Sequence, residues 1–387
     1  MSDSKEYPVA VIVIPTYNEA GNIGLLLDEF YNIEFPKIKN WNIKVLVVDA
    51  KSPDGTGEIV EERSKSNSNI YLHTEDKKQG LGSAYVTGFA KSIEELNADV
   101  VIEFDADFQH PPKYVGLLLK EIDNGYDYVL GSRKVPGGSE TYQRNLIRSF
   151  LTSFGSIVAR FILFFPNKLF WQVTDATTGL KATRVRGFMD KLDLRPEHLH
   201  SKKFGYKIQL LSETLHLGAK YKEIPLNFDD RHAGVSKFES TTTIEVLVAC
   251  IKTRLHQEST RRFIKFAIVG VSGYIINAIS LEIFQSLTNI EFLAWAISTE
   301  LAIISNFTLN NLWTFKLRSI TKPENFFKRL LKFNSTSFGA LIIQVAIGTS
   351  GVYLLGENFR QIILVFTSFL IVPFYNWYMY NKFIWRK

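Results

Sequence analysis

The last third of the chain contains four apolar stretches, and they constrain the fold more than any other feature of the sequence. They run near residues 263–287, 292–315, 333–355 and 362–383. Each is about long enough to cross the hydrocarbon core of a bilayer as a helix, which takes about 20 residues. Because backbone polar groups in lipid must be satisfied within the segment, we expect four transmembrane helices here.

Basic residues around these stretches predict their orientation. They gather before the first stretch, between the second and third, and at the C-terminus: Arg261, Arg262, Lys265, Lys316, Arg318, Lys322, Lys328, Arg329, Lys332, Lys382, Arg386 and Lys387. The other two loops contain one basic residue, Arg360. The positive-inside rule therefore predicts a cytoplasmic location for both termini and for the region that precedes the membrane. Residues 262–266 recur in similar form as residues 329–333, which suggests two related hairpins.

Net charge narrows the class of binding partner, and cysteine content narrows the kind of site and the cellular compartment. A net charge of +6 suits nucleic acid, anionic lipid or phosphorylated ligands. The membrane stretches favour lipid and phosphate, so we expect no nucleic-acid partner. Cys250 is the single cysteine, which allows no intramolecular disulfide and no cysteine-based zinc site. This fits a catalytic region in a reducing cytosol.

An apolar strand that ends in acidic residues is the candidate metal site. Residues 100–104 are nearly all apolar, as is typical of a buried strand in a mostly parallel sheet. Asp105, Asp107, Gln109 and His110 follow, and two prolines then stop the strand. Ligands of open α/β sheets bind at the carboxyl ends of strands, where two carboxylates can share a divalent cation that holds a diphosphate. The alternative is a polar turn that caps the next helix.

Polar residues also follow other predicted strands. The remaining strands are expected at residues 9–14, 43–48, 70–73, 128–130 and 221–228. Glu19 follows the first and Asp49 the second, whereas Arg133 follows the strand at 128–130. Asp49 is placed like the acidic residue that binds a ribose hydroxyl in nucleotide-binding folds, although the G-x-G-x-x-G fingerprint is absent. Its alternative role is an Asx turn or a helix N-cap.

Two further segments could bind phosphate. Residues 77–84, KKQGLGSA, precede a helix, whose N-terminal N–H groups and nearby lysines could contact phosphates. Alternatively, Ser83 is only an N-cap. After the last strand, Arg231 and Lys237 lie on a glycine-containing loop that could close over phosphates, or that is a solvated basic loop.

Two amphipathic helices are expected at residues 144–165 and 243–255. Each combines an apolar stripe with basic residues on the opposite side. This pattern is typical of helices that lie on a membrane surface, and equally of ordinary helices that face a core.

Together these motifs resemble the dolichyl-phosphate mannose synthases, which are inverting GT-A glycosyltransferases of family 2. The segments that carry the resemblance are PTYNE (15–19), VVDAKSPDGT (47–56), GLGSA (80–84), FDADFQHPP (104–112), GSR (131–133) and DDRHAGVSKF (229–238). The apolar stretches, with SNFTLNNLWTFK (305–316), resemble the GtrA-type membrane domain. The resemblance implies a Rossmann-like α/β GT-A catalytic domain at 1–240, an interface helix at 241–260, and an all-α domain of four transmembrane helices in two hairpins at 261–387.

The resemblance also implies roles for individual residues. The nucleotide sugar would be bound by Pro15, Tyr17, Glu19, Asp49, Gly82, Asp105, Ala106 and Lys237. Mg²⁺ or Mn²⁺ would be held by Asp105, Asp107 and Gln109. The acceptor phosphate would be bound by Arg133, Arg144, Arg148 and Ser149. The residues expected to act in catalysis are Asp105, Asp107, Arg133 and Arg231.

The chain departs from the family pattern at two places. Ala50 stands where the family usually has a second aspartate. After Arg144, the family often reads R-x-x-[IV]-S, but here Arg148 occupies the serine position and Ser149 is displaced by one. A hydroxyl contact to the acceptor phosphate is therefore replaced by Arg148 or lost.

The expected function is transfer of mannose from GDP-mannose to dolichyl or another polyprenyl phosphate at the cytoplasmic membrane face. A glucosyltransferase that uses UDP-glucose is the first alternative. A processive polysaccharide synthase is disfavoured because no tryptophan follows an arginine, as its Q-x-x-R-W motif requires. An alternative of another class is a non-catalytic membrane scaffold or carrier of lipid-linked sugar, against which the intact Asp105-x-Asp107-x-Gln109 argues.

Overall fold

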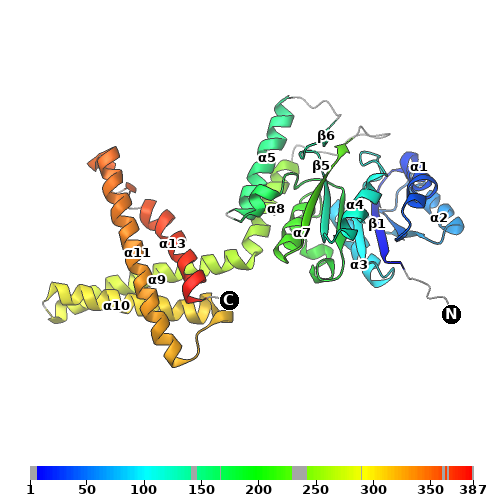
Figure 1. Cartoon of the computed structure of the whole chain (residues 1–387). Helices are drawn as coiled ribbons and strands as arrows, with labels where there is room; N and C mark the ends of the chain where they lie inside the picture. The colour runs from blue at the N-terminus through cyan, green and yellow to red at the C-terminus, as the bar shows by residue number, and fades with distance from the viewer. Residues whose placement is uncertain are drawn as a thin grey trace. The chain divides into compact units, whose positions relative to one another are not determined.

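The structure is a computed structural model with two compact units, Met1–Arg254 and Leu255–Lys387 (Figure 1). It describes residues 7–140, 146–165, 167–228, 242–288, 290–359, 362–363 and 366–385.

A seven-stranded mixed sheet forms the centre of the first unit. Its strands are β1 (Val9–Thr16), β2 (Asn42–Asp49), β3 (Ile70–Thr74), β4 (Val100–Glu103), β5 (Tyr128–Ser132), β7 (Lys181–Arg184) and β8 (Tyr221–Pro225). Their order across the sheet is β3-β2-β1-β4-β7-β5-β8, and β7 runs antiparallel to both of its neighbours. The sequence predicted the six other strands and missed β7. A separate parallel pair joins β6 (Ser139–Glu140) to β9 (Asn227–Phe228).

Helices cover both faces of this sheet (Figure 1). They are α1 (Ala20–Glu29), α2 (Thr56–Ser66), α3 (Leu81–Glu94), α4 (Tyr114–Asp123), α5 (Leu146–Phe164), α6 (Leu169–Gln172), α7 (Tyr206–His216) and α8 (Thr242–His256). Short π or 3-10 turns occur at η1 (Phe30–Glu34), η2 (Phe35–Lys37), η3 (Met189–Lys191) and η4 (Pro196–His198).

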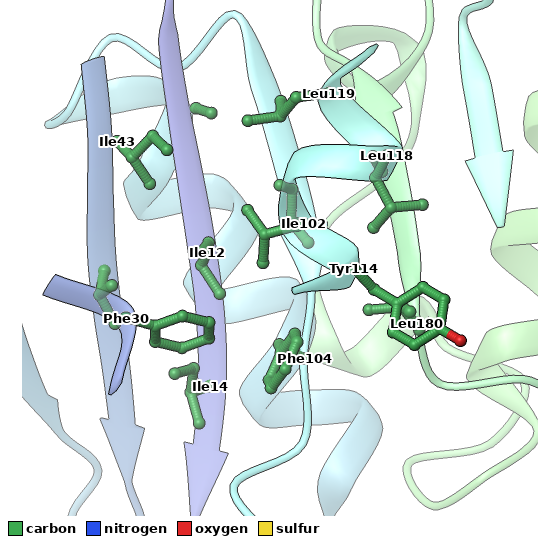
Figure 2. Packing of buried hydrophobic residues seen from close by; sticks show 14 of the residues in the cluster. Ile12, Ile14, Phe30, Ile43, Ile102, Phe104, Tyr114, Leu118, Leu119 and Leu180 are labelled. Carbon is green, nitrogen blue, oxygen red and sulfur yellow. The ribbon is translucent and has the colours of Figure 1, made fainter. Parts of the chain in front are cut away.

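Side chains alternate between the two faces of the sheet along each strand, and this divides the core into two layers. Because successive side chains point to opposite faces, Ile12 and Ile14 pack with Phe30 and Phe104 on one face, as Figure 2 shows. Val11 and Val13 of the same strand pack against α3 and α7 on the other face. Both layers are mainly apolar, as expected for a sheet covered on both sides. The loops at the carboxyl ends of the strands are therefore left to carry the polar chemistry.

Helices α5 and α8 pack on the core, as one of the two expected roles requires, and their contact with a membrane surface stays a prediction. Leu163 and Phe164 of α5 are buried in a third core cluster, together with Cys250 of α8. Other apolar side chains, in the two helices or directly after α5, are exposed: Ile157, Phe161, Phe165, Ile244, Leu247, Val248, Ile251 and Leu255. Each helix therefore packs on the core along one side and presents apolar residues along another.

The second unit is helical. Its elements are α9 (Glu258–Thr288), α10 (Glu291–Leu309), η5 (Asn310–Thr314), η6 (Lys316–Arg318), α11 (Pro323–Leu355), η7 (Glu357–Phe359), η8 (Thr367–Ile371), α13 (Val372–Met379) and η9 (Tyr380–Ile384). They overlap the four predicted stretches. Within the described residues, α9 is the one helix that is both long and apolar enough to cross a membrane by itself.

Aromatic residues and one asparagine organise the end of this helical unit. Phe315 stacks on Trp385, with ring centroids 4.4 Å apart. The Trp385 indole N–H donates to Asn311 Oδ1 at 3.0 Å. The same oxygen accepts the backbone N–H of Ile320 at 2.7 Å, so the buried Asn311 joins three segments of the chain.

Candidate active site

The carboxyl ends of β1, β2, β3, β4 and β5 meet at one edge of the sheet, because these strands are mutually parallel in direction. Asp49 ends β2 and is paired in register with Thr16 of β1. Asp105 lies two residues beyond the end of β4. The strand ends therefore bring together the acidic residues that the sequence singled out, at the edge where α/β sheets bind ligands.

Asp49 holds the loop after β2 through its side chain, but neither as an Asx turn, which would bond the N–H two residues on, nor as the N-cap of α2, which is Gly55. Its Oδ1 accepts hydrogen bonds from the hydroxyls of Thr16, at 2.7 Å, and Ser52, at 2.6 Å. Its Oδ2 accepts the backbone N–H of Ser52 at 2.8 Å. Three donors from the chain thus hold this buried carboxylate, and they fix the loop that follows β2.

The loops after β1 and β2 are tied together by side chains that sequence reasoning missed. The backbone N–H of Asn18 donates to Ser52 Oγ at 3.0 Å, and that of Glu19 donates to Thr56 Oγ1 at 2.9 Å. Asp54 accepts the N–H of Ala20 at 3.0 Å. The Glu19 carboxylate accepts a hydrogen bond from Asn22 at 2.9 Å. The SPDGT segment therefore positions the first βα turn.

The glycine segment before α3 has a different role from the one expected. Gly80, at φ +114°, is the N-cap residue, so the proposal that Ser83 caps the helix is wrong. The N–H of Gly82 donates to the carbonyl of Lys202 at 2.8 Å, and the phosphate contact expected of this segment stays a prediction. A Cβ on Gly82 would lie 2.8 Å from Tyr206 Cβ, which shows that glycine permits close packing of α3 on α7.

Tyr17 and Lys78 form a contact at the same edge. The Lys78 ammonium lies 4.0 Å from the centroid of the Tyr17 ring, which is a cation–π geometry. Pro15 precedes Tyr17 at the end of β1. The loop after β3 therefore reaches across to the loop after β1.

Asp105 is held by groups from two helices. The Tyr85 hydroxyl of α3 donates to Asp105 Oδ1 at 2.9 Å, and Lys207 Nζ of α7 lies 3.9 Å from Oδ2. Ala106 and Asp107 are buried beside it, and Asp107 Oδ1 accepts the backbone N–H of Gln109 at 3.2 Å. Phe108, at φ +62°, lies in this tight turn between Asp107 and Gln109, and the convergence of the three predicted ligands stays a prediction.

These residues fit a hard divalent cation by the chemistry of their donors. Two carboxylates and an amide oxygen are the ligand types that Mg²⁺ prefers, and such ions commonly take further ligands from substrate phosphates. No group of three or more His, Cys, Asp or Glu side chains that could hold a metal occurs among the described residues.

A buried network of charged side chains surrounds Glu103, two residues before Asp105. No sequence motif predicted it. Glu103 is buried at the end of β4, where the Tyr206 hydroxyl donates to it at 3.0 Å and Lys181 Nζ lies 3.8 Å away. Burial raises the pKa of Glu103, and the neighbouring lysines oppose this shift. Burial lowers the pKa of Lys181 to about 8, so it remains charged at neutral pH. Lys181 also donates to the carbonyl of Lys207 at 3.2 Å.

Arg133 is engaged by an aspartate from a distant segment. Its Nε and one terminal nitrogen donate to the two oxygens of buried Asp175, at 2.7 and 2.8 Å. Burial alone would raise the pKa of Asp175, but the Arg133 guanidinium holds it below its usual value. A role of Arg133 toward phosphate stays a prediction.

His110 is also buried, and burial lowers its pKa to about 4, so the ring is neutral at pH 7.

The remaining predicted site residues cannot be placed. Arg144, Arg231 and Lys237 lie outside the described residues. Arg148 and Ser149 belong to α5, but their side chains are not described.

Comparisons with known proteins cover both units. The model of glycosyl transferase family 2 matches residues 11–191, and that of the GtrA/DPMS transmembrane domain matches residues 265–385. The chain is 32% identical, over 86% of its length and 87% of the relative's, to a dolichol-phosphate mannosyltransferase of Pyrococcus furiosus. It is 33% identical, over 61% of its length and 90% of the relative's, to an undecaprenyl-phosphate mannosyltransferase of Micrococcus luteus. A solved mannosyl-3-phosphoglycerate synthase from Rubrobacter xylanophilus matches with a TM-score of 0.46 and 19% identity, over 65% of this chain and 76% of that one.

Proposed function

The chain belongs to the dolichol-phosphate mannosyltransferase family of glycosyltransferases, and we propose that it transfers mannose from GDP-mannose to a polyprenyl phosphate at the cytoplasmic face of a membrane. One observation carries this proposal: the match to the Pyrococcus enzyme extends over 87% of that protein and includes both units of this chain. The GtrA/DPMS match makes it a membrane protein. The expected glycosyltransferase fold and helical membrane domain are confirmed.

The acceptor supplies its own nucleophile in this reaction. The second pKa of a phosphate monoester is about 6, so a polyprenyl phosphate is mostly a dianion at pH 7. A phosphate oxygen attacks the anomeric carbon as the bond to the nucleoside diphosphate breaks, and attack from the opposite face converts an α-linked donor into a β-linked product. The protein needs no general base for this step. It must align the two substrates, stabilise the departing diphosphate and exclude water.

The donor would lie along the carboxyl ends of the strands. Glu19 and Asp49 would flank the nucleoside with Pro15 and Tyr17, and the turn from Asp105 to Gln109 would face the diphosphate. The hydrogen bond from Tyr85 and the nearby Lys207 support this assignment, because they fix Asp105 before any ligand arrives. A divalent ion held by Asp105, Asp107 and Gln109, either Mg²⁺ or Mn²⁺, would offset charge that develops on the leaving diphosphate.

Cationic residues would complete the site around both phosphates. Arg133, Arg144, Arg231 and Lys237 are the candidates, with Arg148 and Ser149 at the acceptor. If Arg231 acts on charge that develops during transfer, its loss should lower kcat more than donor affinity. Loss of one charge-assisted hydrogen bond, about 1.5–3 kcal/mol, corresponds to about a tenfold to hundredfold lower rate.

The first unit would perform the chemistry, and the second would attach the protein to the membrane. We assign residues 1–240 to the catalytic domain, 241–260 to an interface helix and 261–387 to a four-helix transmembrane domain. The positive residues around the predicted spans support a cytoplasmic catalytic domain.

A direct assay tests the function. Membranes that contain the full chain are incubated with radiolabelled GDP-mannose or UDP-glucose, and lipids are extracted into organic solvent. Mannose in the lipid fraction, absent from membranes with Asp107→Ala, supports the proposal. Glucose in that fraction without mannose would replace the proposed donor, and no label from either donor would refute polyprenyl-phosphate transfer of these sugars.

A further inference from the structure

Glu75 is a buried carboxylate that the proposed mechanism does not use. It is the first residue after β3, and its backbone N–H donates to the carbonyl of Asp49 at 2.8 Å. Glu75 is 6% exposed, and its buried Oε2 accepts no hydrogen bond from any residue that the structure describes. Most buried polar atoms in proteins have a partner, so an acceptor left open at a binding edge calls for a donor beyond the residues that the structure describes, and a bound ligand can supply one.

The backbone of Glu75 lies beside the strand ends where the nucleoside is proposed to bind. Asp49, its backbone partner, already accepts three hydrogen bonds from Thr16 and Ser52. Lys78, three residues after Glu75, lies over the ring of Tyr17. The loop after β3 thus contacts the ends of both β1 and β2, where open α/β sheets bind nucleotides. Two buried carboxylates therefore lie near these strand ends. Asp49 stabilises the loop after β2, whereas Oε2 of Glu75 has no hydrogen-bond partner among the described residues.

We propose that Glu75 accepts hydrogen bonds from the base of the donor nucleotide and selects guanine over uracil. Guanine carries two adjacent donors, N1–H and the 2-amino group, and one carboxylate can accept both in a bidentate pair. Uracil carries one N–H between two carbonyl oxygens, and these oxygens repel a carboxylate. This inference rests on the proposed function, because it concerns the base of the sugar donor.

Binding of free nucleotides tests Glu75 separately from transfer. The full-length protein, purified in detergent, is titrated calorimetrically with GDP, IDP and UDP. IDP differs from GDP by loss of the 2-amino group alone. Loss of one hydrogen bond to a charged group weakens binding by about tenfold to hundredfold. We therefore expect wild-type protein to bind GDP at least about tenfold more tightly than IDP, and UDP more weakly still.

A charge-neutral variant and a neighbouring control complete the experiment. Glu75→Gln should reduce the preference for GDP over IDP to less than about threefold, because an amide cannot accept both donors. Asp76→Asn removes the same charge at the adjacent exposed residue, and it should retain the wild-type preference. The thermal midpoint of each variant reports whether it folds. If Glu75→Gln does not fold, equal affinity of wild-type protein for GDP and IDP would still overturn the role of Glu75.

The outcomes separate this inference from the function on which it rests. Equal affinity of wild-type protein for GDP and IDP would overturn the role of Glu75, even if membranes transfer mannose from GDP-mannose. An unchanged GDP preference in Glu75→Gln would do the same. Tighter binding of UDP than of GDP would overturn both the role of Glu75 and the proposed donor.

Discussion

Gly179 lies where a single methyl group would disturb the candidate metal turn. It precedes β7 by two residues. A Cβ at this position would lie 2.7 Å from Asp105 Oδ2, 2.8 Å from His110 Cε1 and 2.8 Å from Lys207 Nζ. Real Cβ atoms almost never approach other heavy atoms within 3.0 Å, so Gly179→Ala forces at least one of these groups to move.

The structure indicates which groups resist that movement. Lys207 Nζ ends a flexible side chain and can move readily, whereas the ring of His110 is buried and Asp105 is held by Tyr85. Overpacking of this kind typically costs about 1–3 kcal/mol of stability. For a domain of this size, that corresponds to a thermal midpoint lower by about 2–12 °C. Because a misplacement of about 1 Å near the chemistry can cost about a hundredfold in rate, we expect kcat to fall by about tenfold to hundredfold.

The assay compares two alanine substitutions in the same unit. Gly116→Ala on α4 is the control, because its Cβ would lie 3.4 Å from Ile38 Cδ1, an ordinary contact. Purified variants are assayed for mannose transfer across a range of GDP-mannose concentrations, and their thermal midpoints are recorded. If Gly179→Ala retains the kcat and the midpoint of Gly116→Ala, the packing around Asp105 is looser than described and our reasoning is refuted.

Three further predictions concern charge and the membrane. Asp107→Ala, or excess chelator on wild-type protein, should abolish transfer without a large change in thermal midpoint, and full turnover in chelator would rule out the metal assignment. Lys181→Met leaves Glu103 buried without its cation, so the unfolding free energy should fall by about 3–5 kcal/mol in denaturant titrations. The double variant with Glu103→Gln should recover part of this loss; no recovery would show that the two residues are not coupled. A chain truncated after residue 257 should bind anionic liposomes through α5 and α8 and should detach as salt rises, because charge attraction is screened. Indifference to liposomes in flotation assays would leave both helices as core elements alone.

Strand composition explains which parts of the sheet could be predicted. The strands β1, β2 and β4 are runs of valine and isoleucine, and the sequence located each within a few residues. In contrast, β7 reads Lys-Ala-Thr-Arg, with one apolar residue. Its place in the sheet depends on pairing with β4 and β5 and on the burial of Lys181 beside Glu103. Such a strand is specified by distant partners, so no local pattern indicates it.

The same distinction applies to the site. The positions of Asp49 and Asp105 at strand ends follow directly from the strand pattern. Their hydrogen-bond partners come from other segments of the chain, such as Tyr85 from α3. These partners belong to no recognisable sequence motif, so they could not be predicted. Ser83 was misinterpreted because serine favours N-caps, whereas Gly80 at positive φ lets α3 begin earlier. Local preference was overridden by a backbone conformation that glycine alone adopts readily.

The position of β7 has a consequence for how the protein is synthesised. β7 lies between β4 and β5 in space but follows both in the chain. A nascent chain that has reached only residue 132 therefore has β4 as an open edge, with Glu103 still lacking Lys181. Open strand edges promote association between chains, and partly synthesised domains are vulnerable to it. We therefore expect the first unit to be prone to association during translation until residues 181–184 emerge and join the two halves of the sheet.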